Sequence, residues 1–272
     1  MSKTALRASL YQGPEFSGDV EANLAAVGRA ADSASRAGAD ILVTPEMSIS
    51  GYDIGELVAA RAEPADGPIF DAVARITSET GVAVVYGYPE RDGSVVYNSV
   101  QVVGADGSLV ARYRKTHLFG DLDRGHFVPG DRLVAQFDLD GVRCGLLICY
   151  DVEFPEAVRA HADSGTEFLI VPTGLMTPFD VVATHVVPAR AYESQMFLAY
   201  VNRCGRESEL QYCGLTCAIA PDGSELARAG RGEESLVVDI DTEMLARSRS
   251  INTHLADRRP DRWDRQVVVR GS

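Results

Sequence analysis

Short β-branched runs alternate with amphipathic stretches along this chain, and this alternation constrains the fold more than any other feature. The runs with the length and composition of strands are residues 4–11, 41–45, 82–89, 95–103, 109–115, 142–149, 168–173, 197–202, 214–220 and 235–240. The stretches that place apolar side chains on one helical face are residues 20–37, 69–80, 155–164 and 181–194. The sequence therefore predicts an α/β protein.

Turn signals and burial patterns indicate how these strands pair. The tight turns at residues 91–94 and 104–108 predict antiparallel hairpins, whereas residues 39–46 and 142–151 lie near crossover helices and are typical of buried parallel strands. Together they predict two mixed sheets packed face to face with helices outside. Because no linker or internal repeat is visible, we expect one domain over residues 1–256. Residues 257–272 are charged and interrupted by proline, and we expect this tail to pack on the domain or on a second subunit.

The charge balance excludes several classes of partner. The chain has 26 basic and 39 acidic residues, a formal net charge of -13 and a pI near 4.8. This balance argues against nucleic acids and anionic membrane surfaces as partners, while a cationic small molecule would be compatible. The sequence has neither a membrane-spanning apolar run nor a secretory signal pattern at its start, so we expect a cytoplasmic protein with free thiols on its five cysteines.

Three predicted strands end on residues that can do chemistry. Cys149 ends an apolar strand just before a helix that starts near Pro155, where backbone N–H groups and the helix dipole would face the thiol. Glu46 and Lys115 end two other strands. Each residue alone is also consistent with a plain strand terminus, or for Cys149 a core thiol. Ligands bind at strand ends in α/β sheets, so the three together indicate an active site.

These residues lie in motifs that resemble the nitrilase superfamily of carbon–nitrogen hydrolases over nearly the whole chain. Glu46 in TPEMSISGY, Lys115 in YRKTHLFG and Cys149 in ICYDVEFPE match the glutamate, lysine and cysteine of the superfamily in order, spacing and flanking residues. The resemblance implies a four-layer αββα sandwich, dimers that pair through helices, and no cofactor. Within the superfamily, the 5-aminopentanamidase branch is most similar, on the segments YQG, GYDIG, YGYPER, YNSVQ, FGDLDR, MTPFD and YCG.

The chemistry of amide cleavage gives each of these residues a separate task. We expect Cys149 to be the nucleophile that forms a thioester and Glu46 to be the general base. Lys115 and the backbone N–H of Tyr150 would stabilise the oxyanion. We also expect Lys115 to favour the thiolate and to keep Glu46 ionised. Where the superfamily carries a second glutamate, this sequence has Asp123, which would orient Lys115 or the substrate amide, or would only cap its loop.

The resemblance implies 5-aminopentanamide as the substrate, whose far end is an ammonium group. An acidic or aromatic subsite should receive that group. Glu207 and Glu209 are the first candidates, and Tyr52, Asp53 and Glu153 are alternatives.

Other functions stay open within the same superfamily. An N-carbamoyl amine hydrolase, a nitrilase or an ω-amidase would use the same three residues, and an ω-amidase would need a basic subsite such as Arg203 or Arg206. A binding module that has lost catalysis and a thiol-redox role of Cys149 are further alternatives. Cys213 and Cys217 are typical of core thiols, so we expect no metal site. We expect a homodimer interface at residues 181–194 and in the tail after Asp257.

Overall fold

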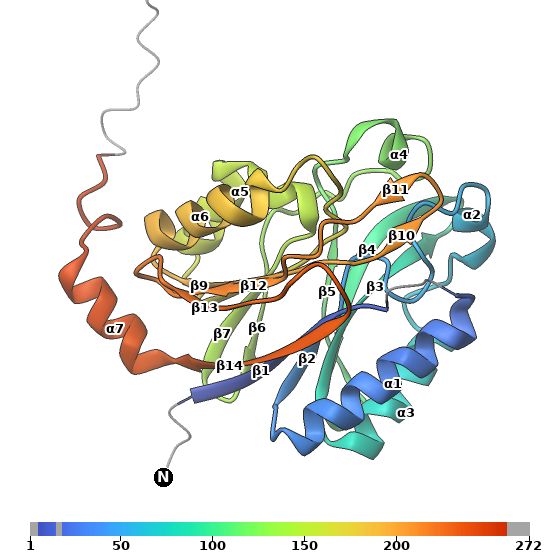
Figure 1. Cartoon of the computed structure of the whole chain (residues 1–272), viewed down its shortest axis with the longest axis horizontal. Helices are drawn as coiled ribbons and strands as arrows, with labels where there is room; N and C mark the ends of the chain where they lie inside the picture. Colours follow the sequence, from blue (N-terminus) through green and yellow to red (C-terminus); the bar gives the residue numbers. More distant parts are fainter. Residues whose placement is uncertain (1–4, 15–17, 260–272) are drawn as a thin grey trace, which may run out of the picture.

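The computed structural model describes residues 5–14 and 18–259, which contain two six-stranded sheets (Figure 1). The first sheet has the order β14-β1-β2-β3-β4-β5, with strands Ala5–Gln12 (β1), Ile41–Val43 (β2), Ala83–Asp92 (β3), Val95–Val103 (β4), Leu109–Arg114 (β5) and Glu234–Asp241 (β14). The second sheet has the order β13-β12-β9-β8-β7-β6, with strands Ala135–Leu139 (β6), Val142–Leu146 (β7), Phe168–Pro172 (β8), Phe197–Val201 (β9), Cys217–Ile219 (β12) and Glu225–Arg228 (β13). A small ribbon pairs Arg206–Glu207 (β10) with Leu210–Gln211 (β11).

Helices cover the outer faces of both sheets. Val20–Arg36 (α1) and Pro68–Thr80 (α3) lie side by side and pack on β2, β3 and β4 of the first sheet (Figure 1). Pro155–Asp163 (α5) and Val187–Ser194 (α6) form the other outer layer, where α6 contacts β9 and β12. The remaining helices are Leu57–Arg61 (α2), Gly120–Arg124 (α4) and Thr242–Ile251 (α7). The expected four-layer αββα sandwich is confirmed.

Both sheets are mixed in the way that the sequence predicts. β1, β2 and β3 pair in parallel, as do β7, β8 and β9, while the turns after β3 and β4 close antiparallel hairpins. The sequence did not predict β6 and β13, because these strands carry several polar residues and little of the apolar pattern that marks a buried strand. The segment expected as one helix over 181–194 begins instead with a π-helical turn, Val182–Val186, followed by α6.

The packing of the two sheets decides where the active site forms. Side chains of β1 and β2, such as Leu10 and Val43, share a buried apolar cluster with Leu146 and Ile170 from β7 and β8. Glu46 lies three residues after the end of β2, and Cys149 lies three residues after the end of β7. The interior of the sandwich therefore holds the carboxyl-terminal ends of two parallel strands from different sheets close together.

Of the predicted tail, the structure describes only residues 257–259, and Arg258 forms an ion pair with Asp163 of α5. The rest of the tail, residues 260–272, lies outside the described residues. No helix in the described part of the chain combines the length and apolar composition needed to cross a bilayer.

Candidate active site

Glu46 after β2, Lys115 after β5 and Asp123 in α4 meet in a buried cluster. The Nζ atom of Lys115 lies 2.8 Å from Oε1 of Glu46 and 2.7 Å from Oδ2 of Asp123. All three side chains are 0% exposed. A buried ammonium is stable only when it is paired in this way. The two carboxylates therefore keep the Lys115 side chain charged and fix the position of its Nζ atom. Burial opposes this charge, but Glu46 and Asp123 raise the pKa of Lys115 well above its usual value.

A strained turn after β2 presents Glu46. Met47, the next residue, has a φ of 51°, in the left-handed region that residues other than glycine rarely adopt. Gly87 of β3 approaches this turn so closely that a Cβ atom there would lie 2.4 Å from the Met47 nitrogen. A glycine at this position of β3 is therefore required for the turn.

Asp123 is held from several sides in α4. Its Oδ1 accepts a hydrogen bond from the hydroxyl of Tyr52 at 2.8 Å, and its Oδ2 accepts one from the backbone N–H of Phe119 at 2.8 Å. Tyr52, one of the predicted substrate-binding residues, is thus in contact with the catalytic cluster through Asp123. Burial raises the pKa of Tyr52 well above its usual value, so its hydroxyl remains a donor.

Cys149 begins a short 3₁₀ turn, Cys149–Glu153, and is itself in the left-handed region with a φ of 47°. The residue is 8% exposed, and its thiol lies near Thr173 and Gly174, which follow β8. Backbone strain of this kind persists where surrounding contacts enforce it and is frequent at active sites. The N–H of Tyr150 belongs to the first turn of this short helix, where amide groups have no helical partner.

Burial decides the resting protonation of the nucleophile. Burial and the nearby Glu46 raise the pKa of the Cys149 thiol, and the opposing effect of Lys115 is smaller. Burial likewise raises the pKa of Glu46, although Lys115 lowers it in part. Lys115 lowers the pKa of both groups, as expected, but desolvation is the larger effect at both and raises both pKa values. The raised pKa of Cys149 favours the protonated thiol in the closed site.

One oxygen of Glu46 is free to accept a proton. Oε1 accepts hydrogen bonds from Lys115 and, at 2.6 Å, from Nδ2 of Asn98. Oε2 is buried and accepts no hydrogen bond from any residue that the structure describes. A Cβ atom on Gly174 would lie 3.2 Å from this oxygen, so Oε2 faces the segment that also lies beside the Cys149 thiol. An unpaired buried carboxylate oxygen is costly, and proton transfer is a reason to keep one.

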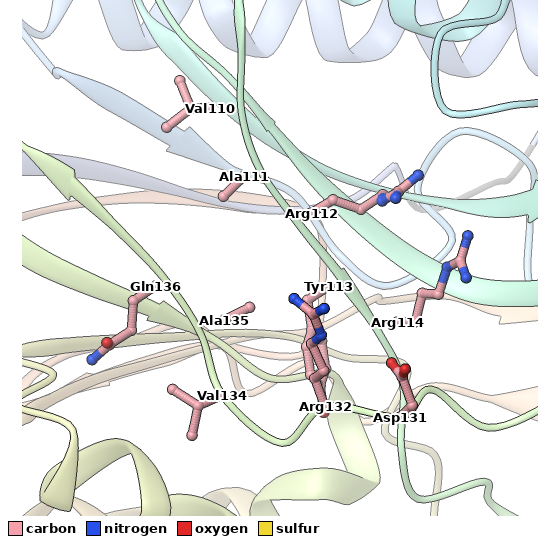
Figure 2. Close-up of a pocket in the computed structure, with 10 residues that line it drawn as sticks. All are labelled: Val110, Ala111, Arg112, Tyr113, Arg114, Asp131, Arg132, Val134, Ala135 and Gln136. Atoms are coloured by element: carbon pink, nitrogen blue, oxygen red, sulfur yellow. The ribbon is translucent and has the colours of Figure 1, made fainter.

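Two cavities lie near the site, and only one of them is lined by a residue of the Cys149 turn. A cavity of about 530 Å³ is lined by Tyr150 of the Cys149 turn and by Phe154 just after it, together with Thr116, His117, Leu118, Arg124, Phe127, Val128 and Pro129. The cavity in Figure 2, about 500 Å³ in volume, is lined by residues of β5, β6 and the segment before β6, and by none of the catalytic side chains. The first cavity is the better candidate for the substrate entrance.

The residues predicted to bind the substrate ammonium differ in their burial and in the partners that they already have. The carboxylate of Glu207 is 9% exposed and is occupied by Arg203, by the hydroxyl of Tyr212 and by two backbone amides. Glu209 is 91% exposed and pairs with Arg206 at 3.2 Å, so it lies outside the buried cluster.

The other two predicted subsite residues also have separate positions. Asp53 donates its backbone N–H to Glu207. Glu153 is half-buried on the same turn as Cys149, and the charge of Lys115 acts on its carboxylate.

Residues that the sequence analysis did not single out complete the site. Asn98 on β4 binds Glu46, and Asp151 connects the Cys149 turn to the end of β5. Asn98 is a buried polar residue within the apolar strand β4, a pattern that could have drawn attention to it. Nothing local indicates the partner of Asp151, which lies 38 residues away at Tyr113.

Comparisons with known proteins agree with this geometry. The profile of the carbon–nitrogen hydrolase family matches residues 7–250. A "Hydrolase in pqqF 5'region" from Pseudomonas protegens is 46% identical over 95% of this chain and 91% of its own length. An (R)-stereoselective amidase from a Pseudomonas species is 40% identical over 81% of this chain and 80% of its own length.

A solved structure extends the likeness to three dimensions. A variant of the amidase from Nesterenkonia sp. AN1, with the acetamide moiety of fluoroacetamide covalently added at its active-site cysteine, superposes with a TM-score of 0.84. The two chains are 31% identical, and the match covers 94% of each. The present chain belongs to the carbon–nitrogen hydrolase family of the nitrilase superfamily and is a hydrolase that acts on amides.

Proposed function

We propose that the protein hydrolyses a small linear primary amide with a cationic far end, with 5-aminopentanamide as the substrate, through a thioester on Cys149. The observation that carries the catalytic part is the free Oε2 of Glu46, which is buried and faces the segment beside the thiol. A resting thiol needs a base within the closed site, and this oxygen is available for that task.

The acylation step follows from these positions. Oε2 of Glu46 takes the thiol proton as Sγ attacks the amide carbonyl carbon, and the carbonyl electron pair moves to oxygen. Lys115 and the N–H of Tyr150 stabilise this oxyanion, and losing one such donor typically costs about 3 kcal/mol in the barrier. When the oxyanion collapses, the C–N bond breaks, Glu46 gives its proton to the departing nitrogen, and ammonia leaves.

Hydrolysis of the thioester, the second half of the reaction, uses the same groups. Water attacks the thioester carbonyl and gives a proton to Glu46, and the oxyanion forms again at Lys115. The C–S bond then breaks, and Glu46 returns the proton to the sulfur. The carboxylic acid product leaves, and the thiol is restored with water as the only reactant besides the amide.

Glu153 is the residue that we assign to the substrate ammonium, in place of Glu207 and Glu209. Its carboxylate lies on the Cys149 turn and receives no hydrogen bond from the described part of the chain. Burial raises its pKa, and the charges of Lys115 and Arg190 oppose this only in part, as expected for a carboxylate without a direct counter-ion. An ammonium several bonds from the amide would supply that counter-ion. Glu207 already has its partners, and Glu209 faces solvent.

The test compares 5-aminopentanamide with pentanamide, which has a neutral end. In the Glu153→Gln variant we expect KM for the cationic amide to rise about tenfold, which corresponds to about 1.4 kcal/mol, and KM for pentanamide to change little. A selective KM increase in Glu209→Gln but not in Glu153→Gln would contradict the assignment. Mass spectrometry should detect an acyl adduct on Cys149 during turnover and none in Cys149→Ala. No turnover of any primary amide would remove the proposal.

An N-carbamoyl amine that carries a second, free amino group is the second candidate substrate, because it has the same cationic end. It is favoured by an N-carbamoylputrescine amidase from Solanum lycopersicum that is 31% identical over 93% of this chain and 92% of its own length. Its hydrolysis would release carbon dioxide as well as ammonia, so measuring both gases separates the two candidates. The same panel should include a nitrile and a dicarboxylate monoamide. For the latter, Arg203 and Arg206 are already paired with Glu207 and Glu209.

A further inference from the structure

A buried ion pair beside the active site has no part in the chemistry described above. Nη2 of Arg203 lies 3.1 Å from Oε1 of Glu207, and the two side chains are 4% and 9% exposed. Burying two charges is costly unless both find several good partners. The partners of this pair show what it does.

Arg203 holds the turn that presents the general base. Its Nη1 donates hydrogen bonds to the backbone carbonyls of Glu46, at 3.2 Å, and Met47, at 3.1 Å. Met47 is the residue in the left-handed region, so the guanidinium binds the strained turn at the point of strain. Such a conformation persists only where other contacts impose it.

Glu207 holds the other end of the same segment. Its Oε2 accepts hydrogen bonds from the backbone N–H of Tyr52, at 3.0 Å, and of Asp53, at 2.8 Å. The hydroxyl of Tyr212 donates to the same oxygen at 2.6 Å. Tyr52 in turn binds Asp123, the second carboxylate of Lys115. Although burial opposes its charge, Arg203 and the hydrogen bond from Tyr212 lower the pKa of Glu207, so the pair is ionised.

The two residues of the pair lie outside the sheet that precedes the segment they bind, and Glu207 itself lies in β10 of the small ribbon. Residues 46–53 follow β2 of the first sheet, whereas Arg203 follows β9 of the second. β9 pairs with β8, and Thr173 and Gly174 beside the Cys149 thiol follow β8. The pair therefore connects the segment that carries the base to the sheet that carries the nucleophile.

We propose that Arg203 and Glu207 form a positioning pair that fixes Glu46 and Tyr52 relative to Cys149, and that Glu207 does not bind the substrate ammonium. This inference rests on amide hydrolysis by the Cys149 site and is independent of the charge of the substrate. Catalytic rates are sensitive to misplacement of about 1 Å, so a loosened pair should lower kcat more than it changes KM.

Glu207→Gln is the direct test. The Gln carbonyl can still accept from the two backbone amides, but its NH₂ group would face Arg203, so the ion pair is lost with little change of shape. We expect kcat for both pentanamide and 5-aminopentanamide to fall about tenfold or more, with KM within about threefold for each. Glu225→Gln is the matched control, because it removes an Arg–Glu pair on the edge strand β13 and should leave both constants unchanged.

Tyr212→Phe keeps the test decisive if Glu207→Gln does not fold. This variant removes only the hydroxyl that binds Glu207 and should lower kcat about threefold on both amides at constant KM. An unchanged kcat in a folded Glu207→Gln variant would overturn the proposal. If Glu207→Gln does not fold, an unchanged kcat in Tyr212→Phe would overturn it. A KM increase confined to 5-aminopentanamide would also overturn it. Failure of the substrate assignment would appear differently, as a wild-type enzyme that turns over pentanamide and not the cationic amide.

Discussion

Cys149 and Glu46 exchange a proton, and burial sets the pKa of both groups. Both pKa values are raised, and at both groups desolvation is the largest cause. A raised pKa makes Glu46 a stronger base than an exposed glutamate, which suits it to take a proton from a neutral thiol. Asn98 acts in the opposite direction, because its hydrogen bond to Oε1 stabilises the ionised carboxylate.

Removing the amide of Asn98 should therefore change the pH profile. In Asn98→Ala the pKa of Glu46 rises further, and since the base must be ionised to accept the thiol proton, activity is lost as the pH falls through that pKa. We expect the acidic limb of kcat/KM for pentanamide to move upward by about one pH unit relative to the wild type. Rates measured between pH 4 and 9 would show this, and an unmoved acidic limb would disprove the role of Asn98.

At the scale of elements, Asp151 connects the Cys149 turn to the strand end that carries Lys115. Its carboxylate is fully buried and accepts from the N–H of Ile148 at 3.1 Å and from the hydroxyl of Tyr113 at 2.9 Å. It also accepts hydrogen bonds from the hydroxyl of Thr116 and the backbone N–H of His117, the two residues after Lys115. One carboxylate thus sets the distance between β5 and the nucleophile turn.

Substitution of Asp151 should weaken both stability and catalysis. In Asp151→Asn, one oxygen is replaced by a donor that faces other donors, so we expect a loss of about 2 kcal/mol in the free energy of unfolding and at least a tenfold lower kcat. Tyr113→Phe is the control, because it removes one donor and leaves the carboxylate. It should cost about 1 kcal/mol and change kcat about twofold at most. Urea denaturation and steady-state rates measure both, and equal effects of the two variants would contradict this account.

At the scale of the whole molecule, the outer layer at α6 carries exposed apolar side chains. Phe179, Val181 and Tyr192 are 42%, 54% and 44% exposed, and all three lie within or next to residues 181–194. We propose that this surface pairs with a second copy of the chain, as the sequence analysis expected. The predicted contribution of the tail falls largely on residues 260–272, outside the described part of the chain.

Light scattering after size-exclusion chromatography tests this pairing. We expect a mass of twice the 29.3 kDa of one chain for the wild type, and dissociation toward the monomer in Val181→Arg, because an unpaired charge is costly in an apolar interface. Val237→Arg is the matched control, since Val237 is 45% exposed on β14, and it should remain a dimer. A wild-type monomer at all concentrations would reject the interface.

The sequence by itself determined the order of ten strands and four helices, the central parallel strands, and the placement of Glu46, Lys115 and Cys149 at strand ends. These features follow from periodicity, turn residues and motif spacing, all of which are local. The edge strands β6 and β13 escaped prediction because their half-exposed, polar residues weaken the local pattern.

Only the tertiary structure decided the roles of the other site residues. Glu207 meets the N–H groups of Tyr52 and Asp53 across 155 and 154 residues of chain, so no local pattern could show that its carboxylate is already occupied. The protonation of Cys149 likewise depends on how deeply the packed sheets bury it. Desolvation and long-range hydrogen bonds arise only when distant segments pack together. They therefore distinguish catalytic carboxylates from structural ones, which sequence motifs alone cannot do.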